Sequence, residues 1–164
     1  MMVNVLPILP VKEAIFTQRL PVYNETFSLL MPQEKTRKEN RKLMQRLMST
    51  CVIWHEGEAG RSAEDVAGAY LVFLNEVCRD VTRVVIWADN CAGQNKSWAL
   101  MTALLKAIHS PRTKTKTITM KYFEPGHTSM SADATHQVLS KNLSRRGIVE
   151  DWRDYVDTME ERIL

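Results

Sequence analysis

The segment RVVIWAD, at residues 83–89, contains the most strand-like run in the chain, and the other elements are interpreted around it. Four apolar residues follow one another from Val84 to Trp87, a pattern typical of a strand that is covered on both faces. The strand is expected to end at Ala88. Asp89, the first polar residue after it, is therefore expected at the carboxyl edge of a sheet, where open α/β sheets bind ligands.

Patterns on either side of this strand predict an α/β fold. Ser62 and Asp65 have the spacing of a capping box, which opens a helix. The residues expected on the inner face of that helix are Val66, Ala69, Tyr70, Phe73, Leu74 and Val77. Further helices are predicted at residues 33–48, 98–108, 131–143 and 150–162, and strands at residues 22–30, 51–54 and 115–123. The proline-rich first twenty residues are expected to be an extended lead-in, and the order of elements predicts a mixed sheet flanked by helices.

Length and composition limit the class of protein. The 164 residues, 45% of them hydrophobic and 25% charged, are expected to form a single globular domain. The three cysteines are too few and too scattered for a disulfide framework or a zinc ribbon. No apolar run reaches about 18 residues and the first ten residues lack the features of a signal peptide, so we expect a nuclear or cytoplasmic protein without a membrane segment.

The distribution of charge is more informative than its sum. A net charge of +3 does not by itself indicate a nucleic-acid partner. Basic residues gather, however, at residues 35–46, 112–121 and 141–146, which gives three stretches able to meet phosphates. Lys114 and Lys116, in the second stretch, are candidate contacts to nucleic acid, and ordinary solvated surface charge is the alternative for each stretch.

Two polar clusters contain the other candidate residues. The first, DNCAGQNK at residues 89–96, is dense in side chains that donate and accept hydrogen bonds. Its candidate nucleic-acid contacts are Asn90, Gln94, Asn95 and Lys96. The second, GHTSMSADATH at residues 126–136, adds His127 as a candidate contact and opens a helix, with Ser131 expected as the cap and Gly147 as the end. Asp133 and His136, three residues apart, share one face of that helix.

Asp89, Asp133 and His136 form a candidate catalytic and metal-binding site. Carboxylates and histidine suit Mg²⁺ or Mn²⁺, and carboxylates from two elements can clamp two such ions. The carboxylates of Asp89 and Asp133 are then expected within about 8 Å of each other. Each residue also has a structural interpretation: Asp89 as an Asx turn, Asp133 as a first-turn carboxylate favoured by the helix dipole, and His136 as a helix surface residue.

The two clusters resemble an uncharacterised domain family of eukaryotic transposon-related proteins, which looks ribonuclease-H-like. Shorter similarities extend the resemblance over most of the chain, at LPILP (residues 6–10), RLPVYN (residues 19–24) and WHE (residues 54–56). The resemblance implies an ancestral metal-dependent phosphodiester transfer on DNA, as in transposases and integrases. It implies Asp89, Asp133 and His136 as the residues of the site.

The sequence departs from the family pattern at its start. The resemblance implies a first catalytic aspartate on an opening strand just before the Leu-Pro motif, whereas residues 1–4 contain no acidic residue. We therefore expect the opening strand to be missing and, since the chain stops within a predicted helix, the domain to be truncated at both ends. A site short of one carboxylate binds Mg²⁺ weakly, so the domain is expected to be inactive. The alternatives are a domesticated module that binds nucleic acid without catalysis and an interaction protein with an unrelated α/β fold.

Overall fold

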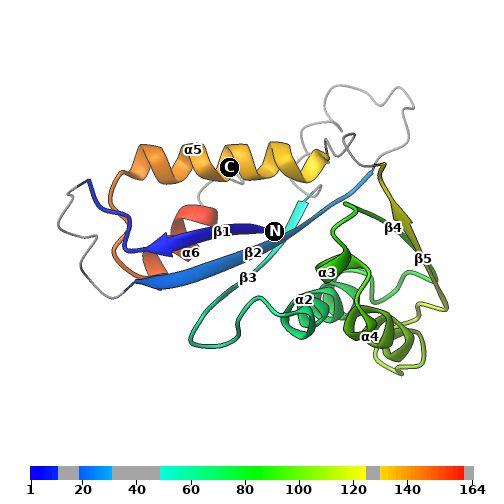
Figure 1. Ribbon diagram of the computed structural model, residues 1–164. Coiled ribbons are helices and arrows are strands. Elements are labelled where there is room, and N and C mark those ends of the chain that lie inside the picture. Colours follow the sequence, from blue (N-terminus) through cyan, green and yellow to red (C-terminus); the bar gives the residue numbers. More distant parts are fainter. Residues whose placement is uncertain (11–18, 31–48, 125–129, 161–164) are drawn as a thin grey trace, which may run out of the picture. The chain divides into compact units, whose positions relative to one another are not determined.

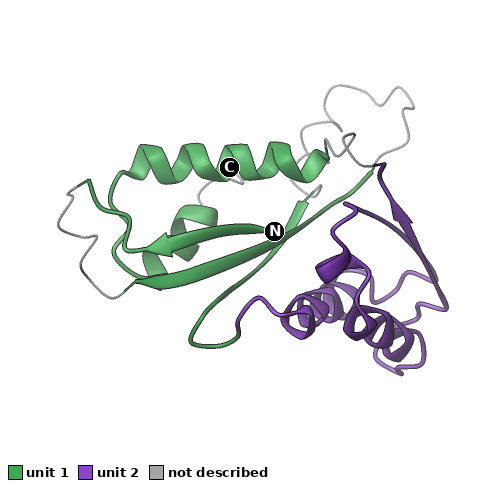
Figure 2. Cartoon of the chain, in the orientation of Figure 1, with its two compact units in different colours: residues 1–59, 130–164 green, residues 60–129 purple. Residues whose placement is uncertain are grey.

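The chain forms two compact units in a computed structural model (Figure 1), which describes residues 1–10, 19–30, 49–124 and 130–160. Unit 1 comprises residues 1–59 and 130–164, and unit 2 comprises residues 60–129 (Figure 2). The predicted basic helix at residues 33–48 lies outside the described residues, and the expectation of a single domain stays a prediction.

Unit 1 is an antiparallel sheet with two helices. Its elements are β1 (Met2–Leu6), β2 (Leu20–Ser28), β3 (Ser49–His55), α5 (Ser131–Arg146) and α6 (Trp152–Glu160). The strand order is β1-β2-β3 (Figure 1). The two helices cover one face of the sheet, because Leu139 and Leu143 of α5 and Tyr155 of α6 share a buried cluster with Leu6 and Val22.

Unit 2 is a parallel strand pair with three helices. Its elements are α2 (Ala63–Glu76), β4 (Arg83–Ala88), α3 (Ala92–Asn95), α4 (Trp98–Ile108) and β5 (Thr117–Tyr122). β4 and β5 pair in parallel, with Ala88 opposite Tyr122 at their carboxyl ends. The long helices α2 and α4 pack on each other and contribute buried side chains such as Val66, Leu74 and Leu100.

The structure confirms the α/β class and the predicted elements that fall in the described ranges. The capping box of α2 is also confirmed: the backbone N–H of Asp65 donates to Ser62 Oγ at 3.3 Å, and that of Ser62 donates to Asp65 Oδ2 at 2.8 Å. None of the helices in the described ranges is long and apolar enough to cross a membrane. The described strands form two sheets, one antiparallel and one parallel, rather than the single mixed sheet that the order of elements predicts, so the fold is confirmed only at the level of mixed α/β.

Four local expectations were wrong. The proline-rich lead-in contains a true strand, β1, which pairs with β2 before the first proline. β4 is covered on one face only, since Val85 and Trp87 are 44% and 41% exposed. Val77, expected on the inner face of α2, is 46% exposed because it is the C-cap residue and lies past the last helical turn. The N-cap of α5 is Met130 rather than Ser131.

Candidate functional site

Asp89 follows β4 directly and folds back on the loop that it opens. Its Oδ1 accepts a hydrogen bond from the backbone N–H of Cys91 at 3.0 Å, which is the Asx turn that the sequence left open. The same oxygen accepts from Asn95 Nδ2 at 2.7 Å. Two donors thus hold one carboxylate oxygen in place, whereas no bond to Oδ2 is formed within the described residues.

Asn95 is the centre of this loop. Its side chain is buried and bridges two elements, because its Nδ2 donates to Asp89 and its Oδ1 accepts from the hydroxyl of Tyr70 at 3.1 Å. Its backbone carbonyl accepts from the hydroxyl of Tyr122 at 2.9 Å. Both polar atoms of the Asn95 side chain therefore have hydrogen-bond partners inside unit 2, which is a structural role. The contact of Asn95 with nucleic acid stays a prediction.

The other polar residues of the loop are more accessible. Asn90 and Gln94 are partly exposed and make no side-chain hydrogen bond within the described residues. Lys96 is exposed, and its Nζ lies 4.9 Å from the centre of the Tyr122 ring, a distance at which a cation and an aromatic ring attract each other. These three side chains are free to meet a ligand in a way that Asn95 is not.

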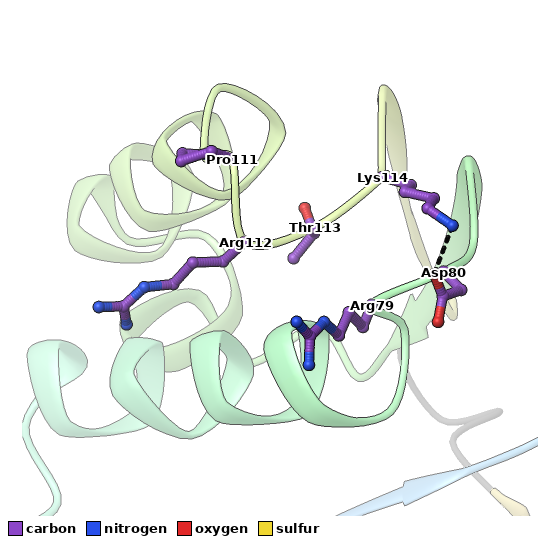
Figure 3. A pocket seen from close by; sticks show the side chains of 6 residues that line it. All are labelled: Arg79, Asp80, Pro111, Arg112, Thr113 and Lys114. Atoms are coloured by element: carbon purple, nitrogen blue, oxygen red, sulfur yellow. Dashed lines mark ion pairs between the residues drawn. The ribbon is translucent and has the colours of Figure 1, made fainter.

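A basic depression is lined by residues that precede β4 and β5, at the amino ends of these strands (Figure 3). It has a volume of about 440 Å³ and is lined by Arg79, Asp80, Pro111, Arg112, Thr113 and Lys114. Lys114 Nζ lies 2.8 Å from Asp80 Oδ1, and this hydrogen bond lowers the pKa of Asp80. Both side chains are more than two-thirds exposed, so the pair contributes little to stability.

Positive charge nevertheless prevails in this depression. Arg79 and Arg112 form no ion pair with any residue of the described ranges, so three cations face one carboxylate. Lys116, just beyond it, is exposed and likewise makes no ion pair within those ranges. The predicted phosphate contacts at Lys114 and Lys116 are therefore compatible with this surface, although Lys114 already has a partner.

Asp133 lies in the first turn of α5, and its side chain caps the amino end of that helix. Its Oδ2 accepts a hydrogen bond from the backbone N–H of Met130 at 2.8 Å, which satisfies a donor that the helix cannot use. A carboxylate in this position is also favoured by the helix dipole. This is the structural interpretation that the sequence allowed for Asp133, and it uses one of the two carboxylate oxygens.

His136 belongs to a partly buried chain of polar side chains that links α5 to the sheet of unit 1. Its Nε2 lies 3.0 Å from Thr26 Oγ1, and that hydroxyl donates to Asn24 Oδ1 at 3.1 Å. Which of the two atoms donates depends on the tautomer of the ring: when the hydroxyl gives its one proton to Asn24, Nε2 carries a proton and donates to Thr26. In that tautomer Nε2 has no lone pair to offer a metal ion.

The pKa of His136 gives unit 1 a pH-dependent stability. Burial of the ring lowers this pKa from the ordinary 6.5, with a smaller lowering from the amino group of Met1 and an opposing effect of the Asp133 carboxylate. As pH falls below about 6.5, unfolded His136 takes up a proton before folded His136 does. Stability is therefore expected to fall in this window and to be independent of this group at higher pH.

The measurement is urea unfolding between roughly pH 5 and pH 8, followed for the wild-type chain and His136→Gln. Glutamine keeps a donor for Thr26 but does not titrate, so the variant should lose part of the decline at low pH. His109→Gln, at an exposed position on the same chain, should decline in parallel with the wild type. Parallel curves for His136→Gln and the wild type would contradict the burial argument.

The three candidate ligands fall in different units. Asp89 belongs to unit 2, whereas Asp133 and His136 belong to unit 1. Among the residues that the structure describes, no group of three or more His, Cys, Asp or Glu side chains is positioned to hold a metal ion. The described residues of either unit alone therefore do not form a clamp for Mg²⁺ or Mn²⁺, and the 8 Å approach of Asp89 to Asp133 stays a prediction. His127 lies outside the described residues.

The polar chain of unit 1 was not predicted, although the sequence contains its signal. Asn24, Thr26 and Ser28 alternate with other residues, so they point to the same face of β2. Ser28 contacts Ser49 of β3, and Ser49 contacts Thr135 of α5, at 2.8 Å in each case. Polar residues at every second position of a strand that enters a core are the pattern that would have indicated such a chain.

Three local features stand out around the candidate residues. The described residues show a polar loop after β4, a carboxylate that caps α5 and a histidine bonded to β2. All three features fall within the two clusters on which the resemblance to transposon-related proteins rests. Comparisons of the chain with models of protein families, with curated proteins and with solved structures found no match.

Proposed function

We propose that the chain is a transposase- or integrase-like, ribonuclease-H-like nuclease domain that has lost catalysis and still binds nucleic acid, with DNA as the expected partner. The strand directions are compatible with this proposal, because β1, β2 and β3 pair antiparallel and β4 and β5 pair in parallel, in two separate sheets. The position of Asp89 agrees as well, since it follows a parallel strand at its carboxyl end.

One observation carries the loss of catalysis. Each of the three candidate ligands already gives a polar atom to a hydrogen bond within its own unit: Asp89 to Asn95, Asp133 to Met130, and His136 to Thr26. A two-ion clamp needs carboxylate oxygens that are free to bridge the ions. Each carboxylate keeps one oxygen without a hydrogen bond in the described residues, but these partners hold Asp89 in a turn and Asp133 in a helix cap, and residues 1–4 lack the further aspartate that the resemblance implies. Together these features favour the non-catalytic module over an active enzyme.

Nuclease and strand-transfer assays with Mn²⁺ test this proposal. The wild-type chain is expected to cleave and join DNA no faster than Asp89→Ala, because neither has a complete clamp. Both should bind DNA, and Lys116→Gln should weaken the binding and reduce its salt slope by about 0.9, the value for one lost phosphate contact.

Two results would contradict the proposal in different ways. Turnover by the wild-type chain that Asp89→Ala abolishes would restore the enzyme. A failure of the wild-type chain to bind any DNA at low salt would remove the nucleic-acid function and leave the interaction protein as the better account.

A further inference from the structure

The outer face of the β4–β5 pair is an exposed sheet surface. In the parallel register Val85 lies beside Thr119 and Trp87 beside Lys121, and these positions alternate with the buried Val84 and Ala88. Val85 and Trp87 are 44% and 41% exposed. Val85 and Trp87 therefore place two apolar side chains next to each other on the exposed face of β4.

Trp87 is held in a fixed arrangement on this face. Its ring lies 5.3 Å from that of Phe123, with an interplanar angle of 36°, and Lys121 Nζ lies 4.9 Å from its centre. The cation of β5 and the phenyl ring of the residue just after that strand therefore both contact the indole. The result is a pair of tilted aromatic rings with a positive charge over one of them.

The charge of this surface selects the class of ligand. β4 and β5 contain no acidic residue, and both cations of the two strands, Arg83 and Lys121, are exposed and occupy positions on the same face as Trp87. A second protein would have to bury these cations, whereas a polyanion neutralises them. Charge complementarity thus favours nucleic acid over an apolar protein surface.

The rings further select the form of the nucleic acid. A base can stack on an aromatic side chain only when its own face is free, as it is in a single strand and not within a duplex. We propose that the outer face of β4–β5 binds single-stranded nucleic acid, with a base stacked on Trp87 and Phe123 and phosphates beside Lys121 and Arg83. That the ligand is a nucleic acid rests on the proposed function. That it is single-stranded and binds this face of the sheet rests on the contacts of Trp87, Phe123 and Lys121.

The inference is tested on the full chain by fluorescence anisotropy, with a labelled single-stranded DNA of about 12 nucleotides and with the matching DNA duplex. The single strand should bind more tightly than the duplex. Trp87→Ala should weaken single-strand binding about 10-fold, and Trp87→Phe should recover most of the loss, because a phenyl ring still stacks. Lys121→Gln should reduce the salt slope by about 0.7, the value for one phosphate of a single strand.

Two matched controls belong to the same unit. Trp98, at the start of α4, is 87% exposed and not on this face, so Trp98→Ala should leave binding unchanged. Lys106→Gln, in the last turn of α4, should leave the salt slope unchanged. If Trp87→Ala does not fold, Trp87→Leu replaces it, since leucine keeps the apolar bulk and removes the ring.

The remaining outcomes separate this inference from the proposed function. Equal binding of single strand and duplex, unaffected by Trp87→Ala, would overturn the inference and leave the proposed function standing. A Trp87→Ala variant that changes the oligomeric state and not the affinity would show that a second copy of the chain covers the face, and would overturn it as well. Absence of binding to either form would overturn the proposed function and this inference together.

Discussion

Asn95→Ala is expected to lower the free energy of unfolding of unit 2 by about 2–4 kcal/mol. The substitution removes a buried amide that donates to Asp89 and accepts from Tyr70, while it keeps the backbone carbonyl that accepts from Tyr122. Hydrogen bonds to a charged group contribute more than neutral ones, so most of the loss should come from the bond to the Asp89 carboxylate. Urea or thermal unfolding, followed by circular dichroism, measures the change.

Asn90→Ala is the matched control for this prediction. It removes the same side chain from the same loop, at a partly exposed position without a side-chain hydrogen bond in the described residues. The control should change stability by less than about 0.5 kcal/mol. If Asn95→Ala were as mild as Asn90→Ala and weakened DNA binding instead, Asn95 would be a ligand contact and not the centre of the loop.

Tyr155→Ala is expected to lower the free energy of unfolding of unit 1 by about 3–5 kcal/mol. Tyr155 is completely buried, and its ring stacks on that of Trp152 with centroids 6.1 Å apart. Its hydroxyl accepts a hydrogen bond from Asn4 Nδ2 at 3.0 Å, while burial raises the pKa of the phenol to about 12. Alanine therefore leaves a cavity in the core and an amide of β1 without its partner.

Tyr155→Phe divides this effect into its two parts. The phenyl ring fills the core, so the remaining loss of about 1–2 kcal/mol should represent the hydrogen bond to Asn4. Asp157→Ala, at an exposed position of the same helix, should change little. Equal effects of Tyr155→Ala and Asp157→Ala in chemical denaturation would show that α6 is not part of the unit 1 core.

Features of the fold that depend on neighbouring residues could be predicted from the sequence. The capping box of α2 and the Asx turn at Asp89 are set by residues two or three positions apart. The strand at residues 83–88 is set by a continuous apolar run. The same run did not reveal how many of its faces are covered, because apolar residues occur on exposed strand faces as well as on buried ones.

The candidate site depends on contacts between distant residues, and these were beyond the sequence. His136 and Thr26 are 110 positions apart, and their contact depends on the register of β2 and the seating of α5. A single sequence contains the polar alternation of β2 but not the helix that meets it. For the same reason the candidate residues could be named individually, whereas their grouping into one site could not be derived from spacing.

The polar chain beneath α5 also limits how that helix can move. Adjacent residues of the helix, Thr135 and His136, contact two different strands through Ser49 and Thr26. A slide by one residue displaces both side chains by about 1.5 Å along the axis and turns them by about 100°, so both hydrogen bonds break together. Sliding α5 along its axis therefore breaks both hydrogen bonds. A movement of α5 that keeps them must move β2 and β3 together with the helix.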